Sequence, residues 1–151
     1  MSGGGLKLSI EQNIELVRTF IRKFWNEGNL ECKDQYLTED YVDHAYVPSN
    51  KDGLANMAGI LHTAFPDQVS TVESIVVQDD RMVVRLRMTG THEGDFRGTA
   101  ASHQRIDVNL YREYRIENGR IAEHWALFDT ASLLRQIGAE LHQQPVCQIN
   151  K

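Results

Sequence analysis

The sequence is poor in residues that constrain a chain covalently or sterically. Its 151 residues include three prolines and two cysteines, Cys32 and Cys147. The two cysteines lie far apart and form no Cys-x-x-Cys pair, so free thiols in a reducing compartment are the simplest interpretation. We therefore expect a cytoplasmic protein.

Long apolar runs and concentrated positive charge are also missing. No apolar run approaches the roughly 20 residues that a membrane-spanning helix needs. The 16 Lys and Arg residues against 21 Asp and Glu residues give a net charge of −5, and no basic stripe is available to neutralise phosphates. These absences exclude a membrane and nucleic acid as expected partners and leave a small molecule or a second copy of the chain.

Apolar residues recur every three or four positions between residues 10 and 24, as they do on one face of a helix. This spacing predicts a helix over residues 10–27, with Ser9 and Gln12 as a capping box at its start. Shorter helices are predicted over residues 30–37, 54–65 and 133–137.

After Pro66 the pattern changes to the alternation of apolar and polar residues that is typical of strands. Strands are predicted over residues 69–78, 81–92, 104–116 and 120–128. Helices followed by a meander of antiparallel strands predict one α+β domain over residues 9–138, between a flexible leader (1–8) and a C-terminal tail (139–151). A curved sheet against the long helix would leave a concavity for a small ligand.

The sequence lacks the short motifs of nucleotide, zinc and serine-nucleophile sites. It has no phosphate-binding glycine loop, no His-Glu-x-x-His and no Gly-x-Ser-x-Gly. Its six histidines are irregularly spaced, so we predict no metal site. Proton transfer by ordinary side chains is the chemistry that remains.

Residues 123–129 are the most informative segment. In an extended strand Trp125 and Asp129 share one face. If that face is buried, desolvation raises the pKa of the carboxyl group toward the range of a general acid or base. Alternatively, Asp129 caps the helix that follows, and the N–H groups at the helix start lower its pKa. The residues alone leave both interpretations open.

Other aromatic and apolar residues are candidates for the wall of the concavity. Met88 and His92 lie on the apolar face of the second predicted strand, so both are expected to point into it. Trp25 and Phe65 are most simply core residues, and either could also line the pocket.

The remaining histidines are weighed against a purely structural role. His44 ends a short extended segment beside Asp43, whose carboxylate could orient the imidazole. His124 alternates away from Trp125, so it is expected to face a helix or a subunit contact rather than substrate.

Taken together, several segments resemble the SnoaL-like polyketide cyclases over most of residues 10–138. The segments are Asp43-His44, Phe65-Pro66-Asp67, Gly90-Thr91-His92-Glu93-Gly94 with Phe96 and Gly98, Asn118-Gly119-Arg120-Ile121-Ala122-Glu123-His124-Trp125, and Asp129. The resemblance implies a cone-shaped α+β barrel, in which a curved antiparallel sheet packs on N-terminal helices as in nuclear transport factor 2. It also implies a homodimer packed sheet to sheet.

The resemblance carries expectations for the chemistry as well. Members close a ring by an intramolecular aldol condensation on a polyketide ester, without metal or cofactor. An aspartate that matches Asp129 acts as general acid and base, a histidine that matches His44 is a pocket residue, and His92 lies in a matching segment. The chain departs from the family after Gly98, where His103 is expected at the pocket rim.

The leading hypothesis is therefore a cofactor-independent enzyme that transfers protons on a hydrophobic, oxygenated small molecule, with aldol cyclisation as the reaction. One alternative keeps the pocket but uses it for isomerisation or epoxide hydrolysis. The other is a non-catalytic dimeric module that binds a small ligand, which follows if Asp129 is only a helix cap.

Overall fold

The computed structural model describes residues 2–139. The helical elements are α1 (Ser2–Phe20), the π-helical η1 (Ile21–Asn26), the 3₁₀ turn η2 (Leu30–Cys32), α2 (Lys33–Tyr36), α3 (Lys51–Ala64) and α4 (Thr130–Gln136). The strands are β1 (Leu37–Asp43), β2 (Val69–Gln78), β3 (Arg81–Thr91), β4 (Arg105–Glu117) and β5 (Arg120–Phe128). Residues 140–151 of the expected tail, with His142 and Cys147, lie outside the described residues.

The first helix is longer than its apolar pattern. Helical backbone begins at Ser2 and continues through Ser9, so the predicted capping box does not start the helix. The residues before Ser9 include Leu6, Lys7 and Leu8, which are good helix formers. The helix thus enters the segment 1–8 that was expected to be a leader.

The strands form one five-stranded sheet in the order β1-β5-β4-β3-β2. Neighbouring strands from β2 to β5 run antiparallel, whereas β1 pairs in parallel with β5. The α+β class and the curved sheet on N-terminal helices are confirmed, but the sheet stays open because β1 and β2 each pair on one side only. The cone is therefore closed by helices rather than by strand pairing.

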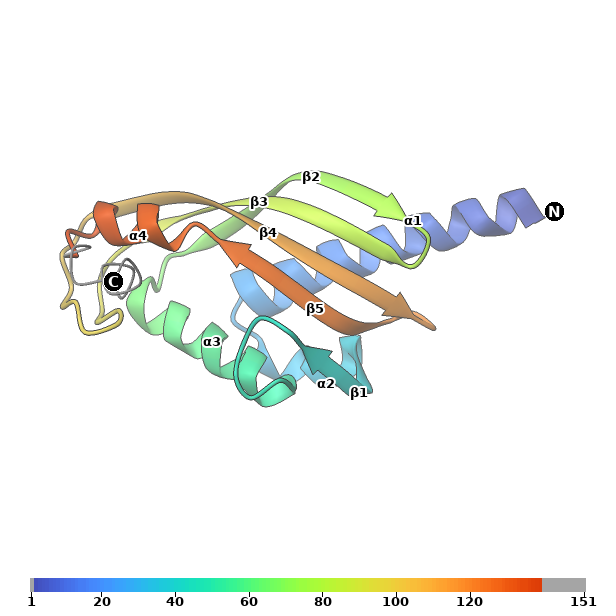
Figure 1. Cartoon of the computed structure of the whole chain (residues 1–151), viewed down its shortest axis with the longest axis horizontal. Coiled ribbons are helices and arrows are strands. Elements are labelled where there is room, and N and C mark those ends of the chain that lie inside the picture. Colours follow the sequence, from blue (N-terminus) through green and yellow to red (C-terminus); the bar gives the residue numbers. More distant parts are fainter. Residues whose placement is uncertain (1, 140–151) are drawn as a thin grey trace, which may run out of the picture.

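One face of the sheet is covered by the helices, and the core lies between them. In Figure 1, α1 passes behind the strands, and α4 lies at the end of the sheet where β5 finishes. Buried side chains from α1 and η1, from α3 and from the inner faces of β3 and β4 make one cluster that includes Phe20, Leu61, Leu86 and Leu110. Within residues 2–139 no helix is long and apolar enough to cross a membrane.

Candidate active site

A cavity of about 290 Å³ lies between α3, the end of β5 and two loops. Its walls are mainly apolar, as in most small-molecule sites. The lining residues are Ala45, Tyr46, Met57, Ile60, Leu61, Phe96, Arg97, Ala126, Phe128 and Thr130. The cavity is the concavity that the sequence led us to expect between the sheet and a helix, but α3 rather than the long first helix forms its wall.

Two glycines hold the loops of the cavity against α3. A Cβ on Gly53 would lie 1.9 Å from the carbonyl oxygen of Pro48, and one on Gly94 would lie 2.2 Å from that of Thr63. No other residue permits such close approaches. The loop after β1, which carries Tyr46, and the loop after β3, which carries Phe96 and Arg97, are thereby fixed in place.

Tyr46 connects this cavity to a charged group in the core. Arg112 donates a hydrogen bond from Nη1 to the Tyr46 hydroxyl, at 3.1 Å. The Arg112 side chain comes from β4 and is 2% exposed, and its guanidinium carbon lies 4.0 Å from the centre of the Trp25 ring. Tyr46 therefore has its ring at the cavity wall and its hydroxyl against a buried cation.

His124 on β5 is the second partner of Arg112. Nη1 of Arg112 lies 3.2 Å from Nε2 of His124, and arginine can only donate. Nε2 must therefore accept, so His124 is neutral and its proton is on Nδ1, which donates to Asp43 Oδ2 at 3.1 Å. Burial lowers the pKa of His124, and the charge of Arg112 lowers it further, in agreement with a neutral ring.

Asp43 at the end of β1 is the buried anion of this group. Its carboxylate accepts hydrogen bonds from the Tyr41 hydroxyl at 2.6 Å, from His124, and from the amides of Ala45 and Tyr46 at 2.9 and 3.1 Å. Burial opposes ionisation, but the donors outweigh it and hold the pKa of Asp43 below its usual range. Asp43 also fixes the backbone of Tyr46, while Arg112 fixes its hydroxyl.

We call Tyr41, Asp43, His124, Arg112 and Tyr46 the inner network. Strand geometry explains why they meet. Asp43 pairs with His124 across β1 and β5, and Tyr114, two residues from Arg112, pairs with His124 across β4 and β5. The side chains of Arg112 and His124 are thus diagonal neighbours on the inner face of the sheet.

Asp129 has the environment of a helix cap. Its carboxylate accepts from the Ser132 amide at 3.2 Å and from the Ser132 hydroxyl at 2.7 Å. These donors lower the pKa of Asp129, which is the shift expected of a cap. Of the two interpretations left open by the sequence, the structure has the cap with its lowered pKa and not the buried carboxyl group with a raised one. The chain neighbours of Asp129, Phe128 and Thr130, both line the cavity.

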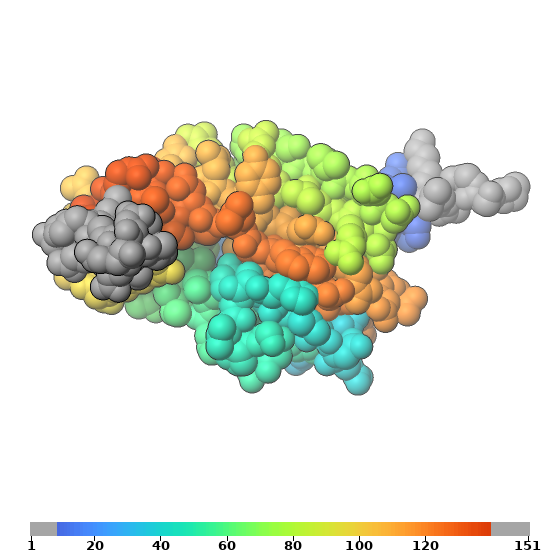
Figure 2. All heavy atoms as spheres, in the orientation of Figure 1, coloured from blue at the N-terminus to red at the C-terminus, as the bar shows by residue number. Residues whose placement is uncertain are grey.

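Trp125 and His44 lie on the outer face of the sheet. Their rings stack with centroids 4.7 Å apart, and Arg81 lies over the indole ring at 5.0 Å. The expectation that the Trp125 face of β5 is buried is wrong, since Leu127 on the same face is 75% exposed. Figure 2 shows β5 (orange) at the surface beside β1 with the segment after it (cyan), and β4 is its neighbour on the other side.

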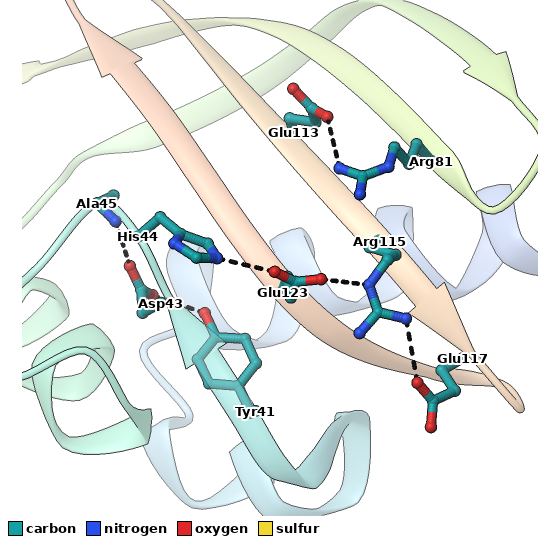
Figure 3. A network of polar contacts seen from close by, with 9 residues as sticks. All are labelled: Tyr41, Asp43, His44, Ala45, Arg81, Glu113, Arg115, Glu117 and Glu123. Atoms are coloured by element: carbon teal, nitrogen blue, oxygen red, sulfur yellow. Dashed lines mark hydrogen bonds and ion pairs between the residues drawn. The ribbon is translucent and has the colours of Figure 1, made fainter.

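Polar side chains on this face form what we call the outer network, Arg115, His44, Glu123 and Glu117. His44 Nε2 lies 2.8 Å from Glu123, Arg115 also donates to Glu123, and Arg115 lies 3.0 Å from Glu117. These partners, His44 first, lower the pKa of Glu123. In Figure 3, His44 points toward Glu123, while Asp43, next to it in the chain, points toward Tyr41.

The other predicted pocket residues lie behind or beside the cavity. Phe65 and Met88 are buried in the core, and the Phe65 ring packs against Phe96 of the cavity wall. His92 is fully buried against Phe65 and accepts from the Ser102 amide through Nδ1. His103 is exposed in the loop after β3 and lies 2.6 Å from Glu93.

Trp25 does not line the cavity. Its ring packs on Arg112, which donates a hydrogen bond to Tyr46 of the cavity wall. None of the residues predicted for catalysis or for the pocket is itself part of the cavity lining, whereas Phe96, named only for the family resemblance, is. Among residues 2–139 no group of three or more His, Cys, Asp or Glu side chains is arranged to hold a metal ion.

Sequence reasoning missed Arg112 and Tyr46, although a signal for Arg112 was present. The alternation of apolar residues at Ile106, Val108 and Leu110 places position 112 on the same inward face. An arginine there is a charged residue at a core position, which marks a functional or paired group. Tyr46 lies in a loop and carries no comparable periodic signal.

A family model described as SnoaL-like polyketide cyclase matches residues 15–137. This chain belongs to that family. Among the curated proteins, none matches this sequence significantly. The family resemblance expected from the sequence is thereby confirmed.

Solved structures agree with the membership. TsrD from Streptomyces laurentii is 27% identical and superposes with a TM-score of 0.77, covering 86% of this chain and 97% of its own. AclR from Streptomyces galilaeus, described as a proposed hydroxylase, is 27% identical with a TM-score of 0.75, covering 85% and 96%. IdmH from Streptomyces antibioticus, a proposed polyketide cyclase, is 25% identical with a TM-score of 0.74, covering 85% and 99%.

Proposed function

We propose that this SnoaL-like protein is a cofactor-independent enzyme that cyclises a hydrophobic, oxygenated small molecule by an intramolecular aldol reaction. The observation that carries the proposal is the apolar cavity of about 290 Å³ with a hydroxyl group, that of Tyr46, held against a buried cation at its core side. Family membership supports a cyclase-type reaction.

The reaction needs a base beside the cavity, and Asp129 is our candidate. A base removes a proton from a carbon next to a carbonyl group, and the resulting enolate carbon attacks a second carbonyl carbon of the same molecule. The alkoxide that forms then takes up a proton, so the reaction is a net isomerisation with no oxidant or reductant. Asp129 stands between two cavity-lining residues, and its lowered pKa suits substrates whose carbon acid is already activated by two carbonyl groups.

The substitution Asp129→Asn tests this role. Asparagine caps helices as well as aspartate does, so α4 keeps its start while the base is lost. With an aromatic polyketide methyl ester as substrate, we expect cyclised product to form about 10²–10⁴-fold more slowly. The thermal unfolding midpoint should stay close to that of the wild type.

The variant Ser132→Ala gives a second readout of the same base. It removes the hydroxyl that stabilises the Asp129 carboxylate at 2.7 Å, so the pKa of Asp129 should rise. The acid limb of the pH–rate profile should then move to higher pH. Near-normal turnover by Asp129→Asn would contradict the proposal, and labelled solvent oxygen in the product would indicate hydrolysis instead.

A second candidate function is a non-catalytic module that binds a small ligand. It is favoured by one observation, the capping of α4 by Asp129. If Asp129→Asn binds ligands and unfolds as the wild type does, and neither protein turns over a polyketide ester, this second function replaces the first.

We also propose that two copies associate through the outer face of the sheet. Val76, Val83, Tyr111 and Leu127 expose 65%, 37%, 47% and 75% of their surface there, and Val76 pairs with Val83 while Tyr111 pairs with Leu127. Apolar patches of this kind favour association. The substitution Leu127→Glu should convert a dimer to a monomer in sedimentation velocity, whereas Val47→Glu, at an exposed loop position, should not.

A further inference from the structure

The Tyr46 hydroxyl group is set up to donate a hydrogen bond into the cavity. A phenol has one donor and can accept as well. Arg112 occupies the acceptor side, at 3.1 Å, and among residues 2–139 it is the one hydrogen-bond partner of this hydroxyl. Its hydrogen is therefore free for a molecule in the cavity that Tyr46 lines.

The groups behind Tyr46 hold it in this orientation. Asp43 accepts from its backbone amide at 3.1 Å, and Arg112 is itself held between the Trp25 ring and Nε2 of His124. His124 can accept from Arg112 only when its proton is on Nδ1. The direction of each hydrogen bond is therefore fixed: Arg112 donates to His124, His124 donates to Asp43, and Arg112 also donates to Tyr46. Each of these groups is already hydrogen-bonded or packed in the structure, and donors fixed in advance are what electrostatic preorganisation requires.

Arg112 also makes Tyr46 a stronger donor. Its charge is buried, 2% exposed, and a buried charge acts on its neighbours through a low dielectric. The nearest described anion, Asp43, is separated from the guanidinium by the neutral His124 ring. The phenol therefore accepts a hydrogen bond from a buried positive charge while its residue lines the cavity.

The buried surroundings of Arg112 contain further donors. Nε1 of Trp25 and the hydroxyl of Tyr114 are buried, and within the described part of the chain neither has a hydrogen-bond partner. Trp25 packs on Arg112, and the Tyr114 ring lies 5.2 Å from that of His124. Two buried donors without a partner thus lie beside Arg112 and His124, behind the residues that line the cavity.

We propose that Tyr46, supported by Arg112, binds the carbonyl oxygen of the substrate that becomes an enolate oxygen. The inference rests on the proposed function and names its substrate class, an enolisable ketone or ester attached to a flat apolar ring system. When the base removes the carbon-bound proton, the electron pair moves onto this oxygen. The Tyr46 hydrogen bond strengthens as the charge develops, and no proton passes to or from Tyr46.

Binding of 2-naphthol tests the inference without any turnover. Its anion places a negative oxygen on an apolar ring of suitable size, and its absorbance distinguishes the neutral from the ionised form. We expect the protein to lower the apparent pKa of bound 2-naphthol. The variant Tyr46→Phe, which keeps the ring, should bind the naphtholate roughly 10- to 100-fold more weakly and should bind naphthalene as the wild type does.

Two further variants complete the test. Tyr111→Phe makes the same change on the outer face of β4 and should leave naphtholate binding unchanged. Arg112→Lys keeps the positive charge but changes the geometry of donation, and it should return the pKa of bound 2-naphthol toward that of the free compound. Thermal unfolding of each variant establishes that it is folded.

The outcomes separate this inference from the proposed function. If Tyr46→Phe binds naphtholate as tightly as the wild type, or if neither naphthol nor naphthalene binds the wild type, the inference is overturned. Asp129→Asn should bind naphtholate at least as tightly as the wild type, because it removes a negative charge beside the cavity. If Asp129→Asn turned over substrate as fast as the wild type while naphtholate binding still depended on Tyr46, Asp129 would be rejected as the base and the oxygen site would stand.

Discussion

The two faces of β4 and β5 carry the same set of chemical groups in different surroundings. The inner network combines Arg112, His124 and the carboxylate of Asp43 beside Tyr46 and Trp25, and its residues Arg112, His124 and Asp43 are 2%, 1% and 0% exposed. The outer network combines Arg115, His44 and the carboxylate of Glu123 (Figure 3), with side chains that are 25%, 37% and 23% exposed. The His44 ring stacks on Trp125.

Solvent exposure gives the two networks different roles. Half-exposed ion pairs are screened by water and salt and contribute little to stability. Buried charges contribute strongly to the field that a ligand meets, but removing one partner leaves the other uncompensated. The inner network includes Tyr46 of the cavity wall, so we expect it to act on a ligand. The outer network lies on the face through which we propose that two copies associate.

The largest difference should come from removing the arginines. Arg112→Met leaves two part-buried or buried acceptors, the Tyr46 hydroxyl and His124 Nε2, without their donor, so the free energy of unfolding should fall by about 2–5 kcal/mol. Arg115→Met, the matched change on the outer face, should lower it by about 1 kcal/mol or less. Urea unfolding followed by circular dichroism measures both, and equal losses for the two variants would contradict the comparison.

A smaller effect should follow from His124 and depend on pH. Its pKa in the folded protein is lowered from 6.5, so the unfolded chain binds more protons below that pH. Stability is then complete above about pH 6.5 and falls as the pH decreases, by at most about 1.4 kcal/mol per pH unit. Urea titrations between pH 5 and 7 should give a shallower slope for His124→Gln.

The control for this pH dependence is His103→Gln. His103 is an exposed loop histidine outside the inner network, so the difference between the two variants isolates the contribution of the inner network. A slope unchanged in His124→Gln would mean that the inner network does not depend on a neutral histidine. Asp43 adds a second loss of stability at lower pH, because its lowered pKa makes the folded state lose stability as the pH falls below about 4.

The smallest effect should come from Glu123→Gln. This change removes the shared partner of His44 and Arg115, yet the free energy of unfolding should change by about 1 kcal/mol or less. The loss should shrink further in 1 M salt, where exposed pairs are screened. A larger loss of unfolding free energy that does not depend on salt would mean that the outer network behaves as a buried charge network does, and would contradict the comparison.

The sequence predicted most of the fold because the fold depends on local periodicity. The strands β2 and β5 have the predicted ends, and the ends of β3 and β4 differ from the prediction by one residue. The start of α1 was placed too late because Leu6, Lys7 and Leu8 are good helix formers that lie outside the apolar period, while propensity does not account for the helical glycines 3–5. The parallel pairing of β1 with β5 is a contact between distant segments, which no local pattern indicates.

The site was harder to predict because two decisions about faces were needed. Alternation in β5 places Trp125 opposite to His124 but does not say which of the two is inside, and the indole ring made the wrong choice attractive. Asp129 was recognised with both its roles, but a cap and a base differ in hydrogen bonds that only the structure resolves. For Arg112 the alternation in β4 was followed only as far as Leu110, one step short.

The most direct test of the account is a crystal structure of the protein with bound 2-naphthol. We expect the rings between Met57, Ile60 and Phe128 and the oxygen within hydrogen-bonding distance of the Tyr46 hydroxyl. A molecule bound on the outer face against Trp125, or one in the cavity whose oxygen contacts Arg97 instead of Tyr46, would contradict the assignment of the inner network as the functional one.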